Sequence, residues 1–276
     1  MKRVLTAAVL LPVALGAVFY LPELAFWFLC VGVIEVAAWE CVRMGARWAP
    51  GSPRWLLLLT VPAATALLTR LLYTETGSEV WWAAALGVSV FVSVGVGVLL
   101  LLARTPVAET AAAFGIVGWG SAYFATAAAS LWALRVIDPW VLVLLLAVIW
   151  SGDCAAFYFG RAFGRHRLAP VVSPKKSWEG AVASTLAGLA AALVWSWLKL
   201  ELIRWDVVAV ATLAGVVGQM GDLVVSMFKR GAGVKDSGDL LPGHGGMWDR
   251  LDSLLFAAPA LLLALWLLEF DAGAMP

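Results

Sequence analysis

The feature that most constrains this chain is a series of long apolar stretches separated by short polar segments. Runs of about 20 apolar residues are long enough to cross the hydrocarbon core of a bilayer as helices. Charged residues make up only 13% of the 276 residues, whereas soluble domains contain about 25%. We therefore predict an all-α membrane protein, a polytopic helical bundle of about nine transmembrane helices. The predicted spans lie near residues 4–20, 22–39, 55–73, 80–102, 110–132, 138–158, 180–199, 206–227 and 253–268.

The distribution of Lys and Arg predicts the orientation of these spans, because cytoplasmic loops of membrane proteins carry an excess of both. With the N-terminus in the cytoplasm, the predicted inner segments hold all but four of the 19 basic residues. The four exceptions are Arg70, Arg135, Lys199 and Arg204. Nine spans then place the C-terminus outside.

The predicted spans divide the chain into two regions. An N-terminal region, 1–135, holds the first five spans, and a C-terminal region, 136–276, holds the other four. The C-terminal region also contains two large polar loops, 160–179 and 228–252, which both fall on the predicted cytoplasmic side. The formal net charge is +1, and the charged residues are segregated by loop. The net charge therefore gives no indication of a nucleic-acid partner, and none is expected.

Residues 226–252 concentrate more polar chemistry than any other segment. They contain four cations, four carboxylates, one histidine and six glycines. Lys and Arg neutralise phosphate oxygens, and glycine lets backbone N–H groups approach a ligand closely. Carboxylates suit Mg²⁺, which commonly bridges protein oxygens and substrate phosphates. The segment therefore favours a phosphate and metal site over the alternative, a solvated loop between helices.

Two carboxylates lie within predicted spans, near their cytoplasmic ends. Asp153 belongs to the sixth span and Asp222 to the eighth. Ionisable groups inside spans are energetically costly and by default indicate a functional site. The alternative for each is a structural ion pair with a nearby arginine.

The first polar loop adds cations to the same side of the membrane. Lys175 and Lys176 precede Ser177 at the start of the seventh span, a pattern that suggests phosphate ligands. Either Ser177 or Ser173 is a candidate cap for that helix, whose N-terminal N–H groups attract anions. The alternative for the basic residues, and the simpler reading of Arg165 and Arg167, is a patch that sets topology and contacts anionic headgroups.

These residues resemble the signature of the phosphatidate cytidylyltransferases, also called CDP-diacylglycerol synthases. From Ser226 to Asp252 the chain has Ser-x-apolar-Lys-Arg, then Lys-Asp after four residues, then His-Gly-Gly and Asp-Arg-apolar-Asp. The first loop reads SPKKSWEG, which is similar to the family's SPKKTWEG. One position departs from the family pattern, because Val225 stands where the family usually has Glu.

The resemblance implies transfer of the cytidylyl group of CTP to phosphatidate, which gives CDP-diacylglycerol and pyrophosphate for phospholipid synthesis. It implies CTP and phosphatidate as substrates, Mg²⁺ with a possible second cation such as K⁺, a homodimer, and a multi-pass protein of the inner (plasma) membrane whose site faces the cytoplasm. Two alternatives stay open: a cytidylyltransferase for another lipid phosphate, such as an isoprenoid ether, and a cation-coupled transporter. Transporters bind near the midplane, whereas the acids here lie near the cytoplasmic ends.

The resemblance also implies roles for individual residues. Expected metal ligands are Asp222 and Asp249, with Asp153 and Asp236 as secondary candidates. Catalytic or phosphate-binding groups would be Lys229, Arg230, Lys235, Arg250 and His244, besides Asp222 and Asp249; His244 would orient a phosphate or shape the glycine-rich turn. Substrate-binding residues would be Ser173, Lys175, Lys176, Ser177, Ser226, Gly245 and Gly246.

Overall fold

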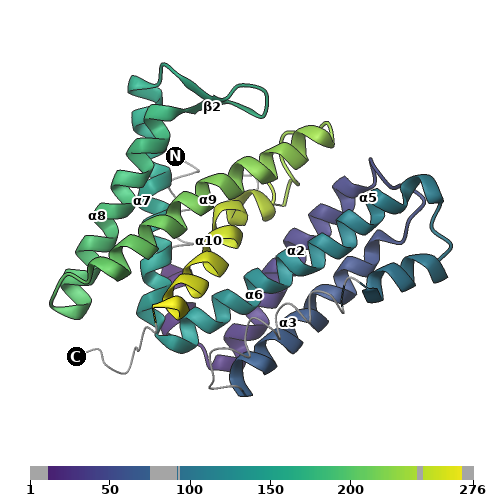
Figure 1. Cartoon of the computed structure of the whole chain (residues 1–276), viewed down its shortest axis with the longest axis horizontal. Helices are drawn as coiled ribbons and strands as arrows, with labels where there is room; N and C mark the ends of the chain where they lie inside the picture. The colour runs from purple at the N-terminus through teal and green to yellow at the C-terminus, as the bar shows by residue number, and fades with distance from the viewer. Residues whose placement is uncertain (1–11, 75–91, 93, 241–244, 269–276) are drawn as a thin grey trace. The chain divides into compact units, whose positions relative to one another are not determined.

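The structure is a computed structural model that describes residues 12–74, 92, 94–240 and 245–268 (Figure 1). Seven helices in these segments are long and apolar enough to cross a membrane. The prediction of an all-α polytopic membrane protein is therefore confirmed. The long helices are α2 (Glu23–Gly45), α3 (Leu57–Thr74), α6 (Gly120–Ile137), α7 (Pro139–Phe163), α8 (Trp178–Leu200), α9 (Trp205–Gly231) and α10 (Trp248–Leu267).

Short elements extend two of the long helices. The 3-10 turn η1 (Arg54–Leu56) leads into α3, and η2 (Val107–Glu109), α5 (Thr110–Phe114) and the π-helical turn η3 (Gly115–Trp119) lead into α6. Residues 12–20 and 94–102 are also helical. They belong to the first and fourth predicted spans, whose remaining residues lie largely outside the described segments. The total of nine spans therefore stays a prediction.

The second polar loop is shorter than the sequence predicted. Helix α9 continues to Gly231, and α10 already begins at Trp248, so the loop between them is 232–247 rather than 228–252. Lys229 and Arg230 end one helix, and Asp249 begins the other. The predicted boundaries were wrong because they were drawn where charges begin, whereas a helix can continue into the polar interfacial region beyond the hydrocarbon core.

The first polar loop contains secondary structure that the sequence did not predict. Strands β1 (Arg167–Ala169) and β2 (Ser173–Ser177) pair antiparallel as a small hairpin, in which Arg167 faces Ser177. Pro174 is tolerated in β2 because a two-stranded sheet consists only of edge strands. The hairpin therefore gives Lys175 and Lys176 defined positions just before α8.

The chain forms two compact units. The first comprises the described residues up to Ala133 together with those of 231–250, and the second comprises 134–230 with the described residues from Leu251 onward. In the first unit, Ala64 and Leu68 of α3 pack with Ala125 and Ala129 of α6. Thr60 and Ser121 also share a 2.5 Å hydrogen bond between their hydroxyl oxygens.

Close helix packing in the second unit depends on glycine. Helices α7 and α8 run side by side (Figure 1). A Cβ atom on Gly152 would lie 2.7 Å from Ser184 Oγ, and one on Gly180 would lie 3.0 Å from the carbonyl oxygen of Ala156. Small residues at helix interfaces in membranes let backbones approach, which increases van der Waals contact. The glycines therefore fix how α8, and the hairpin before it, meet α7.

Helices α9 and α10 meet just as closely at Gly221, which immediately precedes Asp222. A Cβ atom there would lie 2.4–2.7 Å from three atoms of Phe256. We expect Gly221→Ala to destabilise the protein by about 1–3 kcal/mol, the usual cost of overpacking a core. The midpoint of thermal aggregation, measured on detergent-solubilised protein by size-exclusion chromatography, checks this.

Gly32→Ala is the matched control, because nothing lies within 4 Å of a Cβ atom built on that helical glycine. Alanine is favoured over glycine in a helix by about 0.5–1 kcal/mol, so the control should melt at or slightly above the wild-type temperature. Equal midpoints for the Gly221→Ala protein and the wild type would contradict the packing argument.

Candidate active site

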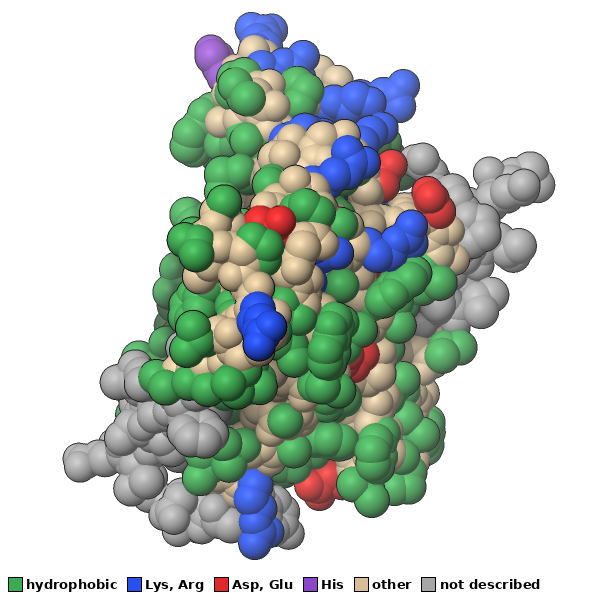
Figure 2. Space-filling model, turned by 90° about the vertical axis from the view of Figure 1, so that its right-hand side faces the viewer, with side chains coloured by type: hydrophobic (Ala, Val, Ile, Leu, Met, Phe, Trp, Pro, Cys, Tyr) green, Lys and Arg blue, Asp and Glu red, His purple; other side chains and the backbone are tan. Residues whose placement is uncertain are grey.

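A cavity of about 610 Å³ lies in the second unit and is called the polar cavity below. Four cations line it: Arg161 of α7, Arg167 of β1, and Lys175 and Lys176 of β2. Asp153 of α7 and Asp222 of α9 contribute carboxylates, and Gln219, Ser184 and Ser253 add neutral polar groups. Figure 2 shows Lys and Arg side chains gathered at one end of the face that it displays, whereas hydrophobic side chains dominate the rest.

Asp222 is the centre of the charged contacts in this cavity. Its Oδ2 atom lies 2.5 Å from Lys176 Nζ, and each of these side chains is 28% exposed. The Ser226 hydroxyl donates to Asp222 Oδ1 at 3.4 Å, one helical turn away. Asp252 of α10 interacts electrostatically with Asp222 and with Lys229, whose side chain is 7% exposed. Two carboxylates therefore lie beside two ammonium groups at one point of the second unit.

The hairpin is held in place at the start of α8. Ser177 is the N-cap of α8, and its Oγ atom accepts a 3.1 Å hydrogen bond from Gly180 N. Of the two candidate caps, Ser177 therefore caps the helix, whereas Ser173 lies at the start of β2. Glu179, in the first turn, accepts from His166 N and contacts His166 Nδ1 at 2.7 Å. The hairpin loop is also tied to the end of α9, because Arg230 Nε donates to the Val172 carbonyl oxygen at 3.2 Å.

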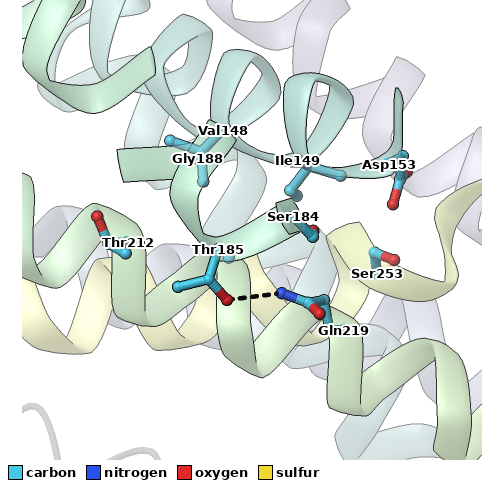
Figure 3. Close-up of a pocket in the computed structure, with 10 residues that line it drawn as sticks. Val148, Ile149, Asp153, Ser184, Thr185, Gly188, Thr212, Gln219 and Ser253 are labelled. Atoms are coloured by element: carbon cyan, nitrogen blue, oxygen red, sulfur yellow. Dashed lines mark hydrogen bonds between the residues drawn. The ribbon is translucent and has the colours of Figure 1, made fainter. Parts of the chain in front are cut away.

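A smaller polar pocket, of about 10 Å³, shares four lining residues with the polar cavity. Figure 3 shows Ser184 and Thr185 of α8, Gln219 of α9 and Ser253 of α10 around it, with Asp153 at one side. Gln219 Nε2 donates to Thr185 Oγ1 at 3.3 Å. Hydrogen-bonding groups therefore continue from the polar cavity in among the helices of the second unit.

Asp249 lies in the first unit, where it organises the loop that precedes α10. Its Oδ2 atom accepts hydrogen bonds from Ser237 N at 2.8 Å and from Gly246 N at 2.9 Å. Gly245 has φ +78°, a conformation that favours glycine, and a Cβ atom on it would lie 2.7 Å from Asp249 Oδ2 and 3.5 Å from Asp236 Cβ. Asp236, Gly245 and Asp249 therefore lie together.

The residues predicted for the site thus divide into two groups. The second unit brings together Asp153, Asp222, Ser226, Lys229, Lys175, Lys176 and Ser177, and also contains Ser173 and Arg230. The first unit contains Lys235, Asp236, Gly245, Gly246, Asp249 and Arg250. Lys235 and Arg250 are exposed. His244 lies outside the described residues.

Val225, the departure from the family pattern, is completely buried in α9. An apolar side chain suits that position, because burying an unpaired carboxylate is costly. The structure thus explains why valine is tolerated there, one residue before Ser226.

Sequence reasoning missed three polar residues that the structure places at important points. Asp252 was treated only as part of the signature, although it follows Asp249 by three residues, the spacing that puts side chains on one face of a helix. Gln219 also lies one turn before Asp222 along α9. Glu40 was passed over, although an acid near the end of an apolar span is a functional signal by default.

The carboxylates of the second unit fit a divalent cation. Among the residues that the structure describes, no group of three or more His, Cys, Asp or Glu side chains forms a metal site. Mg²⁺, however, is usually bound by one or two carboxylates plus substrate phosphates. Asp222, which lines the cavity with its four cations, and the neighbouring carboxylate of Asp252 meet that requirement.

Comparisons with known proteins agree with the signature. The model of the Cytidylyltransferase family matches residues 1–268. A phosphatidate cytidylyltransferase of Pseudomonas aeruginosa is 35% identical over 96% of this chain and 96% of its own. That of Brucella suis is 45% identical over 53% of this chain and 56% of its own length. That of Haemophilus influenzae is 41% identical over 44% of this chain and 46% of its own length. The chain therefore belongs to the cytidylyltransferase family.

Proposed function

We propose that this protein is a CTP-dependent nucleotidyltransferase that transfers the cytidylyl group of CTP to phosphatidate. The products are CDP-diacylglycerol, a precursor for phospholipid synthesis, and pyrophosphate. The single observation that carries the proposal is the polar cavity, which combines four cations with carboxylates in a membrane protein of this family. The relatives are named phosphatidate cytidylyltransferases, and one of them aligns with almost the whole chain. Their names support phosphatidate as the lipid substrate.

The reaction exchanges one phosphoanhydride bond for another. An oxygen of the lipid phosphate forms a bond to the α-phosphorus of CTP, and the bond from that phosphorus to the oxygen bridging the β-phosphate breaks. The electron pair of the broken bond leaves with pyrophosphate. No side chain has to act as a general base, because a phosphate monoester is largely ionised near pH 7.

The main obstacle to this reaction is electrostatic repulsion between CTP and the lipid phosphate. The positive charges that line the cavity reduce this repulsion. Phosphoryl transfer depends chiefly on positioning and on neutralisation of the phosphate oxygens. Lys175 and Lys176 face the cavity from the hairpin, with Arg161 and Arg167 beside them. We assign these four side chains, together with Lys229, Arg230, Lys235 and Arg250, to the triphosphate and the lipid phosphate. The serines Ser173, Ser177 and Ser226 and the glycines Gly245 and Gly246 complete the proposed substrate contacts.

We also propose that Mg²⁺ serves as cofactor. When bound, Mg²⁺ would supply positive charge that neutralises the negative charge developing on the leaving pyrophosphate. Asp222 and Asp249 are the proposed principal ligands, Asp153 and Asp236 are secondary candidates, and the contact between Asp222 and Asp252 adds Asp252 to the set. In the structure, the ion pair with Lys176 holds the Asp222 carboxylate in place. A second cation such as K⁺ is compatible with this number of carboxylates.

An assay with purified protein tests the function directly. Labelled CTP and phosphatidate, with Mg²⁺, should yield labelled CDP-diacylglycerol and one pyrophosphate per lipid. EDTA should abolish turnover, and added Mg²⁺ should restore it. Asp222→Asn and Asp249→Asn keep the size of the side chain and an oxygen acceptor but remove the charge, so each should lower turnover more than tenfold, a loss above about 1.4 kcal/mol.

Asp206→Asn is the matched control on α9. Asp206 lies at the opposite end of the same helix, where it pairs with Arg204 at 2.5 Å, and an exposed ion pair contributes only about 0–1 kcal/mol. The control should keep near-normal turnover. No pyrophosphate release with any lipid phosphate would refute the function, and a clear preference for ether-linked lipids would replace phosphatidate as the substrate.

Substitution of two basic residues near the hairpin distinguishes a role in phosphate binding from a role in membrane topology. Lys175 lines the polar cavity, whereas Arg165, which is exposed, does not. Loss of a charged hydrogen bond costs about 1.5–3 kcal/mol, so Lys175→Ala should lower kcat/KM for CTP by about 10- to 100-fold. Arg165→Ala should leave it within about twofold. A kcat/KM within about twofold of wild type in both variants would assign both residues to topology alone.

We further propose that the protein lies in the inner (plasma) membrane with its site facing the cytoplasm, and that it is a homodimer. The excess of basic residues on one side supports the orientation. The resemblance to the family supports the dimer, and a monomer mass from light scattering of the solubilised protein would disprove it.

Single-cysteine labelling of intact cells tests the orientation. In a background without Cys30, Cys41 and Cys154, a membrane-impermeant maleimide should label Leu202→Cys, which lies in the short segment between α8 and α9 and is 54% exposed. It should not label Val171→Cys in the hairpin, which is 88% exposed, or Asp239→Cys, until the cells are opened. The reverse pattern would place the site outside.

A further inference from the structure

Glu40, in the last two turns of α2, has a completely buried carboxylate that accepts three hydrogen bonds from one distant segment. Its Oε1 atom accepts from Met247 N at 2.8 Å. Its Oε2 atom accepts from Ser237 Oγ at 2.6 Å and from Trp248 N at 2.9 Å. All of these residues belong to the first unit.

These bonds bring both ends of the loop 232–247 to one point. Ser237 lies near its beginning, whereas Met247 and Trp248 lie where α10 starts. The first N–H groups of a helix have no partner within the helix, and its N-terminus attracts negative charge. Glu40 therefore supplies, from another helix, the acceptor that the start of α10 lacks.

Two loop glycines are explained by the same carboxylate. A Cβ atom on Gly246 would lie 2.3 Å from Glu40 Oε2, and one on Gly238 would lie 2.7 Å from Glu40 Oε1. Any larger side chain at either position would push the loop away from Glu40. The second glycine of the His-Gly-Gly motif thus has a structural reason in this chain, which is its close approach to Glu40.

Trp248 provides an apolar counterpart to these bonds. It is 1% exposed, its ring lies 5.5 Å from that of Phe124, and its Nε1 atom donates to the Tyr123 hydroxyl at 3.4 Å. Helix α6 therefore holds one side of this residue, while Glu40 of α2 holds its backbone. The start of α10 is fixed by two helices of the first unit.

We infer that Glu40 is a positioning residue for the nucleotidyl transfer. Glu40 is not itself a proposed ligand of substrate or metal, but it holds the segment that carries Lys235, Asp236, Asp249 and Arg250. Asp249 follows Trp248 directly and bonds Ser237 N and Gly246 N, so its place depends on the loop that Glu40 closes. This inference rests on the proposed function, because only that function gives the loop residues their chemical roles.

A purely stabilising role fits Glu40 less well than a positioning role. Burying a carboxylate is costly, and a well-packed apolar group often stabilises a fold as much as a buried ionic one does. Three directional hydrogen bonds instead specify how Ser237, Met247 and Trp248 lie relative to one another. A defined loop matters most where it presents charged groups to a reacting phosphate.

Glu40→Gln tests the inference with almost no change in volume. Glutamine has one acceptor oxygen, so its NH₂ group must face either Met247 N–H or Trp248 N–H, and one of these donors loses its partner. We expect kcat/KM for CTP to fall at least tenfold in protein that still elutes as a single folded species. Glu35→Gln on the same helix is the matched control, because no described bond links Glu35 to the loop, and it should stay within twofold of wild type.

A readout without substrates separates positioning from general stability. Trypsin cleavage after Lys235 should accelerate at least fivefold in the Glu40→Gln protein, whereas cleavage after Arg47 and Arg54 should not change. Ser237→Ala removes one of the three donors, so it should cause a smaller loss of activity, and little further loss when combined with Glu40→Gln. This variant also keeps the test valid if Glu40→Gln does not fold.

Two results would overturn the inference. One is a folded Glu40→Gln protein with kcat/KM within threefold of wild type. The other is uniformly faster cleavage at all three sites together with normal kinetic constants in the folded fraction, which indicates a structural role only. If wild type makes no CDP-lipid, the proposed function fails by itself, and the cleavage pattern still decides whether Glu40 positions the loop.

Discussion

A hydrocarbon environment offers no partner to a bare backbone N–H or C=O group, and this constraint shapes the whole protein. Membrane-spanning segments must satisfy these groups internally, which helices do. Irregular backbone, and the close ligand approach that it permits, is then confined to the ends of helices. The hairpin 167–177 and the described part of the loop 232–247 lie at helix ends, and side chains there accept from backbone N–H groups: Ser177 at the start of α8, and Glu40 and Asp249 at the start of α10.

Close packing of helices α7 to α10 brings the charged residues of the candidate site together. Because Gly152 and Gly180 allow α7 and α8 to approach, the start of α8 lies against the end of α7. The hairpin before α8 then carries Lys176 to within 2.5 Å of Asp222 on α9. Glycine at position 221 similarly brings α10 against α9, which puts Asp252 beside Asp222. The charged contacts thus depend on residues that have no charge.

The sequence predicted the fold class and the seven described spans because both follow from hydrophobicity along the chain. It also identified Asp153, Asp222 and Lys176, which the structure places in one cavity, since charged residues near the ends of spans are conspicuous. It could not predict the hairpin, whose five-residue strand has no apolar alternation. Nor could it predict the partners of Glu40, because Trp248 lies 208 positions away and no local pattern encodes so distant a contact.

Three carboxylates near the start of α10 show why residue type alone does not reveal a role. Glu40 and Asp249 both accept backbone N–H groups, so each has a structural use whatever else it does. Asp252, one turn further along α10, instead faces a carboxylate and an ammonium group. Only the first two accept hydrogen bonds from residues of the loop 232–247. The role of each carboxylate therefore follows from the donors and charges that it contacts, which residue type does not reveal.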